Sequence, residues 1–210
     1  MDGRPAIEYV IKKGIPGDLV ECGVESGRFE RLWIEELQAQ GCEREIYMYD
    51  TFGGLTKPDK FDYAAAGAVN NPWVDAASVA QTWEQKKLYT ASGEVNGWCY
   101  CPLERVRANL LSTGYPESRL HFVVGDVAKT LTETVPDQIA VLRLDTDWYE
   151  SSKIELEVLY DRVTPGGIVI FDDYYYWDGQ RRATDEFFQT RNIAVNYVKI
   201  NSQTAAMFKP

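Results

Sequence analysis

Acidic residues directly follow two strongly apolar segments of the chain. Residues 139–144 lead into Asp145 and Asp147, and the next apolar segment leads into Asp172 and Asp173. If the two segments are neighbouring strands, they lie only about 4.8 Å apart, so their terminal carboxylates converge. Anions gathered so closely repel one another unless they are protonated or share a cation. Oxygen ligands suit a hard ion such as Mg²⁺, so the pattern predicts a magnesium site.

A plainer interpretation of these aspartates stays open. Asp145 or Asp147 is also suited to capping the helix that follows, and Asp172 with Asp173 is also typical of a turn. For Asp147 in particular, the sequence leaves ligand and helix cap as equal alternatives.

A glycine-containing loop follows the first apolar segment of the chain. Residues 18–22 lead into residues 23–27 (Gly-Val-Glu-Ser-Gly), and a helix-period segment begins directly afterwards. Such a loop lets a ligand approach the backbone at the start of a helix. Glu25 stands where a dinucleotide fingerprint has its second glycine, and Glu21 is close by, so a pyrophosphate would meet two like charges. A cationic or zwitterionic ligand such as S-adenosylmethionine is favoured over NAD.

Two further aspartates end the second and third apolar segments. Asp50 follows residues 46–49, where a carboxylate can accept both hydroxyls of a ribose. Asp126 follows residues 121–124, where it is placed to meet the edge of an adenine. Each signal alone is weak, because an aspartate at a strand end is often a helix cap. Together they indicate a nucleoside site along one edge of a sheet.

The elements that must position these residues alternate between strands and helices. The predicted helices cover residues 29–40, 154–163 and 182–190, and Thr164-Pro165-Gly166-Gly167 is expected to end the second of them. The predicted strands share uniformly apolar sequences, as in parallel sheets covered on both faces, and comprise residues 18–22, 46–49, 121–124, 139–144 and 168–171. Residues 194–200 and 205–208 are joined by a short turn and must be antiparallel. Five parallel strands closed by an antiparallel hairpin make an α/β, Rossmann-like sheet of seven strands, typical of class I methyltransferases.

Residues 53–101 interrupt this alternation. The segment carries five glycines and many aromatic rings, among them Trp73, Trp83 and Trp98, and it offers no strong strand. So many bulky rings exclude a simple linker. We expect one domain over residues 1–210, with residues 53–101 inserted as a lid over the site; a packing flap or an oligomer contact, which would make a homodimer, is the alternative.

Composition limits the partners. With 22 Lys plus Arg against 32 Asp plus Glu, the net charge is −10 over 210 residues, which disfavours nucleic acid. No apolar run is long enough to span a membrane and no secretion signal is apparent, so we expect a cytoplasmic protein. The four cysteines lack the spacing of a zinc site and are expected to be free thiols. The single histidine, His121, excludes Ser-His-Asp and multi-histidine metal chemistry.

Three longer stretches resemble the macrocin O-methyltransferase family, whose members methylate sugar hydroxyls of natural products with the help of Mg²⁺. They are residues 17–24 (Gly-Asp-Leu-Val-Glu-Cys-Gly-Val), residues 49–55 (Tyr-Asp-Thr-Phe-Gly-Gly-Leu) and residues 142–151 (Leu-Arg-Leu-Asp-Thr-Asp-Trp-Tyr-Glu-Ser). The similarity continues through residues 164–167 to Asp172-Asp173-Tyr174 and covers nearly the whole chain.

The resemblance implies specific roles for the acidic residues. Asp145, Asp172 and Asp173 would bind Mg²⁺. Because Asp145 would touch both the metal and the hydroxyl, we predict it to be the general base that accepts the hydroxyl proton. The expected S-adenosylmethionine site consists of Glu21, Gly23, Val24, Ser26, Gly27, Asp50, Thr51, Asp126 and Val127. The expected acceptor is a small hydroxylated molecule, either a sugar or a phenol.

Two other functions remain as alternatives. Asp145-Thr146-Asp147 is also a DxD motif, as in metal-dependent glycosyltransferases, although that function leaves Asp172 and Asp173 without a role. A catalytically silent module that binds S-adenosylmethionine is the third hypothesis.

Overall fold

A computed structural model describes residues 3–68, 72–91 and 93–210 of the chain. Within these residues a seven-stranded sheet has the order β5-β2-β1-β6-β7-β9-β8. Its parallel strands are β1 (Asp18–Cys22), β2 (Ile46–Asp50), β5 (Leu120–Val124), β6 (Ile139–Leu144) and β7 (Val163–Phe171). β9 (Ala205–Phe208) pairs antiparallel with β7, and β8 (Val198–Lys199) pairs antiparallel with β9. The predicted parallel sheet with an antiparallel C-terminal hairpin is confirmed.

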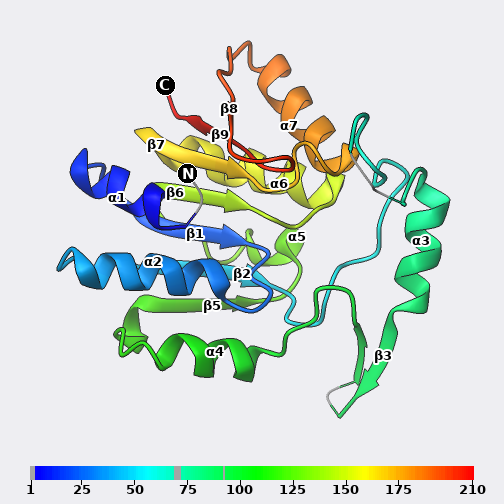
Figure 1. Ribbon diagram of the computed structural model, residues 1–210, viewed down its shortest axis with the longest axis horizontal. Helices are drawn as coiled ribbons and strands as arrows, with labels where there is room; N and C mark the ends of the chain where they lie inside the picture. The colour runs from blue at the N-terminus through cyan, green and yellow to red at the C-terminus, as the bar shows by residue number, and fades with distance from the viewer. Residues whose placement is uncertain (1–2, 69–71, 92) are drawn as a thin grey trace.

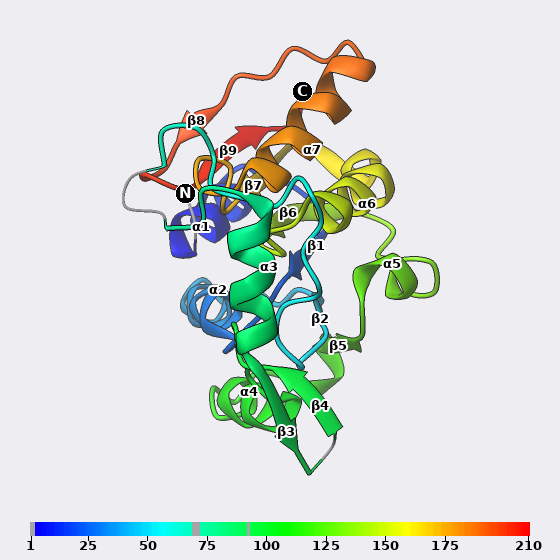
Figure 2. The same ribbon diagram turned by 90° about the vertical axis from the view of Figure 1, so that its right-hand side faces the viewer.

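Helices cover both faces of this sheet. α1 (Arg4–Lys12), α2 (Arg28–Ala39) and α4 (Leu103–Leu111) lie on one face. On the opposite face, as Figure 2 shows, lie α5 (Val127–Thr130), α6 (Tyr149–Leu159) and α7 (Asp178–Thr190). Short 3₁₀ helices at Glu117–Arg119 and Tyr160–Arg162 lead into β5 and β7. None of the described helices combines the length and the apolar character that crossing a membrane requires.

The core explains why the strand sequences are apolar throughout. Successive strand residues point to opposite faces, so Leu19 packs with Trp33 of α2 while Val20 packs with Leu156 of α6. All four of these side chains are fully buried. A strand between two helical layers therefore cannot alternate polar and apolar residues, and this signal made the parallel strands predictable.

Residues 53–101, called the insert below, lie beyond the carboxyl ends of the parallel strands, toward which the strand arrows in Figure 1 point. Their described part contains α3 (Ala76–Gln85) and an antiparallel hairpin of β3 (Lys87–Thr90) and β4 (Gly93–Asn96); residues 69–71 and 92 lie outside the described residues. The Asp75 carboxylate accepts a hydrogen bond from the Ser78 N–H and caps α3. The expectation of no strong strand in the insert is wrong. The hairpin was missed because its residues are largely exposed and lack an apolar pattern.

Three other details differ from the sequence prediction. β7 begins at Val163, so Thr164-Pro165-Gly166-Gly167 lies within the strand and the helix ends before it. The register between β6 and β7 shifts here, and a Cβ on Gly167 would lie 2.9 Å from the Ala140 carbonyl oxygen, so this glycine permits a close crossing. β8 is shorter than the predicted 194–200. α1 and α4 were not predicted.

Candidate functional site

The carboxyl ends of the parallel strands and the insert enclose a cavity of about 320 Å³. Residues from β2, the loops after β1, β5, β6 and β7, and the insert line it. The lining residues are Gly23, Glu25, Tyr49, Asp50, Thr51, Gly54, Leu55, Thr56, Trp73, Trp98, Cys99, Gly125, Asp126, Val127, Asp145, Thr146, Asp147, Ser151, Asp173, Tyr176 and Trp177. Ligands of open α/β sheets bind at this edge of the sheet.

The charge of this lining is entirely negative. Among the described residues that line the cavity, six carry carboxylates, and none is Lys, Arg or His. Such a cavity attracts cations and repels phosphates. It therefore suits a ligand or ion that carries positive charge.

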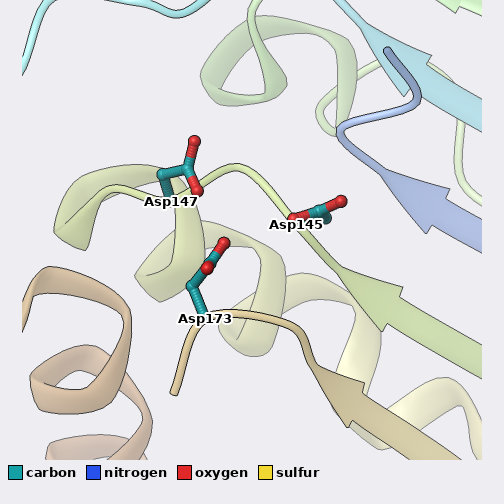
Figure 3. A group of neighbouring side chains, drawn as sticks. All are labelled: Asp145, Asp147 and Asp173. Atoms are coloured by element: carbon teal, nitrogen blue, oxygen red, sulfur yellow. The ribbon is translucent and has the colours of Figure 1, made fainter. Parts of the chain in front are cut away.

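Asp145, Asp147 and Asp173, called the acidic trio below, form the strongest concentration of negative charge. One carboxylate oxygen from each lies within 4.8 Å of the others, a spacing that can hold a metal ion. Figure 3 shows Asp145 and Asp147 on the segment that leaves β6 and Asp173 on the segment that leaves β7, its carboxyl group pointing toward Asp147. Oxygen-only ligands of this kind fit Mg²⁺.

The trio is electrostatically unfavourable without a cation. Burial, together with the charges of Asp145 and Asp172, raises the pKa of Asp147 to about 7. Burial also raises the pKa values of Asp145 and Asp173 well above the ordinary range, and their negative neighbours add to the shift. A divalent cation would remove this penalty by stabilising the ionised carboxylates.

The structure excludes one of the two interpretations of Asp147. α6 begins at Tyr149 with Trp148 as its N-cap residue, so Asp147 does not cap the helix. Its backbone has a φ of 67°, in the left-handed region, and its side chain contacts Asp173. A strained backbone that turns a carboxylate into a cavity is typical of a functional site.

A buried arginine, Arg143, lies behind the trio. Its guanidinium donates to Asp145 Oδ2 (2.6 Å), is ion-paired with Asp172 Oδ1 (2.8 Å) and donates to Glu21. The Arg143 side chain is 1% exposed and lies over the ring of Phe29, with 3.7 Å between the guanidinium carbon and the ring centroid. Arg143 thus fixes Asp145 and provides the positive charge that three buried or half-buried carboxylates need.

The geometry differs from the predicted metal ligands at one position. Asp145 and Asp173 belong to both sets, whereas the structure adds Asp147 in place of Asp172. Asp172 Oδ1 is held by Arg143 and accepts a hydrogen bond from Thr204 Oγ1 (3.2 Å). The charge of Asp172 nevertheless raises the pKa values of both Asp145 and Asp173, so this carboxylate lies beside the trio.

The loop after β1 is shaped by two close contacts. The carboxylate of Asp50 accepts hydrogen bonds from the N–H groups of Val24 (2.7 Å), Glu25 (3.0 Å) and Phe52 (2.6 Å). Gly23 has a φ of 87°, and a Cβ there would lie 2.0 Å from the Asp145 carbonyl oxygen. Only glycine therefore allows the loop to pass next to the segment that carries the trio.

The predicted cofactor residues divide into two groups. Those that line the cavity are Gly23, Asp50, Thr51, Asp126 and Val127. Those that do not line it are Glu21, Val24, Ser26 and Gly27. The prediction placed this second group at the cofactor because it assumed that every residue of the loop faces the ligand.

The second group serves to hold the loop in place. Glu21 is 1% exposed and paired with Arg143, and Val24 packs in the core. The Ser26 carbonyl accepts a hydrogen bond from Asn109 of α4 (3.1 Å), and Gly27 is the N-cap residue of α2. Because Asp50 draws the Val24 and Glu25 N–H groups toward β2, the end of the loop turns toward α4.

Asp126 combines two roles. It lines the cavity, and its carboxylate accepts a hydrogen bond from the Ala128 N–H (3.0 Å) and caps α5. The helix-cap interpretation and the position beside the cavity are therefore both correct for this residue.

An aromatic wall completes the cavity. It comprises Trp73 and Trp98 of the insert together with Tyr176 and Trp177 after β7. The sequence indicated an aromatic rim but not which rings face the site; among them, Trp148 is 2% exposed and packs behind Trp177, with 5.1 Å between the ring centroids. Cys99, Thr146 and Ser151 also line the cavity and were not predicted.

The structure also places the cysteines and the single histidine. All four cysteines are free. His121 stacks on Tyr47 with 4.3 Å between ring centroids and contacts Glu45, outside the cavity lining.

Comparison with known proteins identifies similar chains. The family model Macrocin-O-methyltransferase (TylF) matches residues 2–209. The 8-demethyl-8-(2,3-dimethoxy-alpha-L-rhamnosyl)-tetracenomycin-C 4'-O-methyltransferase of Streptomyces olivaceus is 37% identical over 169 residues, which are 80% of this chain and 57% of the relative. The demethyldecarbamoylnovobiocin O-methyltransferase of Streptomyces niveus is 31% identical over 199 residues, which are 94% of this chain and 68% of the relative. The chain thus spans little more than half the length of the first of these relatives.

Solved structures show the same fold. The O-methyltransferase NovP superposes with a TM-score of 0.79 at 28% identity, covering 98% of this chain and 77% of NovP. The calicheamicin methyltransferase CalS11 gives a TM-score of 0.66 at 19% identity, covering 97% of this chain and 77% of CalS11. The predicted class I methyltransferase fold is confirmed.

Proposed function

The chain belongs to the macrocin O-methyltransferase family, and we propose that it transfers the methyl group of S-adenosylmethionine to a hydroxyl oxygen of a sugar or related small natural-product acceptor with the help of a divalent metal. The observation that carries the proposal is the cavity lined by six carboxylates and, among the described residues, by no basic side chain. The relatives named above act on glycosylated natural products or bear O-methyltransferase names, in agreement with it.

The cofactor is recognised by charge. S-adenosylmethionine carries a sulfonium and an ammonium group, and the carboxylates of Glu25, Asp50 and Asp126 line the cavity at the ends of β1, β2 and β5. Asp50 uses its oxygens to hold the Val24 and Glu25 N–H groups, so it also shapes the loop against which the cofactor lies. A nicotinamide dinucleotide would bring a pyrophosphate to the same place and be repelled.

Asp145 and Asp173 are the proposed metal ligands that both the sequence pattern and the spacing of the carboxylates support. Asp147 completes the trio by geometry, and Asp172 adjoins it. When bound, Mg²⁺ lowers the pKa of a coordinated hydroxyl and fixes its orientation. The carboxylates hold the acceptor oxygen in line for attack on the methyl carbon, and this positioning contributes to the rate.

The hydroxyl proton requires a base. Asp145 is the predicted base. Burial raises its pKa well above the ordinary range, and the contact with Arg143 opposes this shift by favouring the ionised form. Asp147 is the second candidate, because it lines the cavity beside Asp145 and no ion pair between it and a basic residue occurs in the described structure. General bases act best when their pKa lies near the working pH.

The two alternative functions make different demands on the cavity. A glycosyltransferase must bind a nucleoside diphosphate sugar, whose phosphates would face six carboxylates with only the metal as a counter-charge. A silent module would bind S-adenosylmethionine but does not need a metal-binding trio. Both are therefore less consistent with this site than methyl transfer.

Calorimetric titration tests the proposal. S-adenosylmethionine is expected to bind, whereas NAD and UDP-glucose, with or without Mg²⁺, are not. Asp145→Asn is expected to retain S-adenosylmethionine binding and lose methyl transfer to a panel of glycosides and phenols. Binding of UDP-glucose with Mg²⁺ in place of S-adenosylmethionine would contradict the proposal, as would full activity of Asp145→Asn.

We also propose that the protein forms a homodimer and that it is cytoplasmic. The insert exposes Val74 (72%), Leu88 (48%) and Tyr89 (83%), which is consistent with the homodimer predicted from its composition. Analytical ultracentrifugation tests this point, and limited proteolysis tests whether the insert behaves as a lid on a single domain. A cytoplasmic location stays a prediction from the sequence.

A further inference from the structure

We propose that Glu155 of α6 is a positioning residue: its buried, neutral carboxyl group donates a hydrogen bond to Thr146 and thereby holds the turn that presents Asp147 to the cavity. The inference rests on the proposed function, because the position of Asp147 matters only if the acidic trio serves the reaction. It assigns a role to a fully buried acidic side chain that does not line the cavity.

Glu155 is an acidic residue surrounded by apolar ones. It is 0% exposed, and Leu156 and Leu159 of the same helix belong to the apolar core on this face of the sheet. Its Oε1 lies 2.8 Å from Thr146 Oγ1, whereas its Oε2 has no hydrogen-bond partner among the described residues. A buried carboxyl group with a single partner lowers stability. Its presence on this helix therefore indicates a role other than packing.

Thr146 connects Glu155 to the cavity. Its Oγ1 also lies 2.8 Å from Ser151 Oγ, and the Ser151 hydroxyl donates to the Trp148 carbonyl oxygen (3.1 Å). Thr146 and Ser151 both line the cavity, whereas Glu155 does not. The three side chains therefore form one chain of hydrogen bonds that runs from the core to the site.

The number of hydrogens decides which group of this chain donates. The Thr146 hydroxyl has one hydrogen but two oxygen neighbours, and the Ser151 hydrogen is used on Trp148. A neutral Glu155 can donate to Thr146, which then donates to Ser151, so every hydrogen has one acceptor. An ionised Glu155 would be buried without a counter-charge, because no ion pair of the described residues includes it and its charged neighbour Asp126 is also negative. Burial accordingly raises the pKa of Glu155 to about 8, and the neutral form fits the chain.

The same threonine closes a strained turn. Its carbonyl oxygen accepts a hydrogen bond from the Trp148 N–H (2.8 Å), and Asp147 lies between the two with a φ of 67°. A three-residue turn whose central φ is positive is rare and strained, and such a backbone persists only where its surroundings hold it. Thr146 is held by its hydroxyl, and Glu155 is the buried end of that contact. Asp145 and Asp147, the chain neighbours of Thr146, are two members of the trio (Figure 3).

This role can be separated from any effect of Glu155 on the stability of the fold. Glu155→Met keeps the length of the side chain but removes the hydrogen bond and the buried polar oxygens. The urea midpoint at pH 7 should therefore be unchanged or higher, although the turn loosens. Glu155→Gln keeps a donor in the same place and should behave as the wild-type protein does at pH 7.

Amide hydrogen exchange of Trp148 reports on the turn directly, because this N–H donates to the Thr146 carbonyl. Its exchange rate should rise about fivefold in Glu155→Met, the effect of losing one hydrogen bond, and stay unchanged in Glu155→Gln. The Kd of Mg²⁺, titrated calorimetrically in the presence of S-adenosylhomocysteine, should rise about fivefold as well. In methyl transfer to a panel of glycosides and phenols, kcat should fall about tenfold while the KM for S-adenosylmethionine stays unchanged.

Ser152→Ala is the matched control. It removes another fully buried polar group of α6, whose Oγ has no hydrogen-bond partner among the described residues and which does not line the cavity. It should leave the exchange of Trp148 and the Kd of Mg²⁺ unchanged. Thr146→Val keeps the shape of threonine without the hydroxyl; it covers the case in which Glu155→Met does not fold and should have the same effects.

Wild-type exchange of Trp148 in Glu155→Met overturns the inference, and so does faster exchange with no effect on Mg²⁺ affinity or turnover. A loss in Glu155→Gln as large as in Glu155→Met also overturns it, because the ionised carboxylate would then be what the site requires. An equal effect of Ser152→Ala has the same consequence. A wild-type protein that binds no Mg²⁺ and transfers no methyl group would instead refute the proposed function, and the exchange of Trp148 would still decide whether Glu155 holds the turn.

Discussion

Arg143→Met is expected to destabilise the fold severely, because the arginine neutralises three carboxylates from a buried position. Its guanidinium contacts Glu21, Asp145 and Asp172, and its side chain is 1% exposed. Removing one partner of a buried ion pair costs about 3–5 kcal/mol, since the remaining charge is left without compensation. Methionine keeps most of the apolar stem that packs on Phe29, so the loss reports mainly on charge.

The magnitude follows from the number of partners. Three carboxylates lose their counter-charge, but Asp145 and Asp172 are each 24% exposed and recover part of the loss through water. We therefore expect about 4 kcal/mol, within the range for a buried pair. For a chain of this length, this corresponds to a fall in Tm of roughly 8–16 °C.

Urea unfolding at pH 7 measures the loss, with Arg107→Met as the matched control. Arg107 pairs with Glu117 at the surface, where the two side chains are 50% and 52% exposed, and such pairs contribute about 0–1 kcal/mol. Arg143 lowers the pKa values of Glu21 and Asp145, so without it these pKa values rise and the folded state holds protons that the unfolded state releases. The deficit should grow as pH rises and shrink toward pH 5. A loss no larger than that of Arg107→Met would refute the assignment of Arg143 as the counter-charge of the site.

Three further predictions concern pH, metal and backbone. Burial raises the pKa of Glu155 to about 8 from an ordinary 4.5, so its contribution to stability is complete below pH 4.5 and lost as pH rises toward 8. In urea unfolding, Glu155→Gln should reduce the decline in stability between pH 4.5 and pH 8 by about 4 kcal/mol. Mg²⁺ at 100 times its Kd should stabilise the protein by about 2.7 kcal/mol in thermal unfolding, and Asp173→Asn should abolish the gain. Gly23→Ala places a methyl group against the Asp145 carbonyl and should lower kcat about a hundredfold, whereas Gly41→Ala, which meets no atom within 4 Å, should leave kcat unchanged.

The segments whose side chains are buried were those that the sequence predicted best. Residues 139–144 form a strand with the predicted bounds because every side chain there is buried, so the sequence had to be apolar on both faces. The β3–β4 hairpin was missed for the opposite reason: Leu88 and Tyr89 are exposed, and pairing between two short polar strands leaves no periodic pattern. α1 does bury Ala6, Ile7 and Val10 at helical spacing, and this signal was present in the sequence.

The sequence predicted where the site lies better than it predicted which residues contact one another there. Carboxylates at strand ends converge in any parallel sheet, so the sequence could indicate that Asp145 and Asp173 lie close together and that Asp50 and Asp126 lie beside the same cavity. The sequence could not show that Asp147 turns inward through a left-handed backbone, because that conformation depends on the packing of the segment between β6 and α6.

The contacts of Arg143 show what a buried charge in a strand requires from the neighbouring strands. An arginine in the middle of an apolar strand is costly unless carboxylates reach it, so its presence in residues 139–144 already required partners from neighbouring strands. β1 and β7 flank β6, and each contributes one: Glu21 lies opposite Arg143 in the register of β1, and Asp172 follows the end of β7. The same guanidinium holds Asp145 beside Asp147 and Asp173, so the charge that stabilises the sheet also orients the acidic trio. Stability and the proposed metal binding are therefore linked through one side chain, and the effect of a substitution at Arg143 should be measured on both.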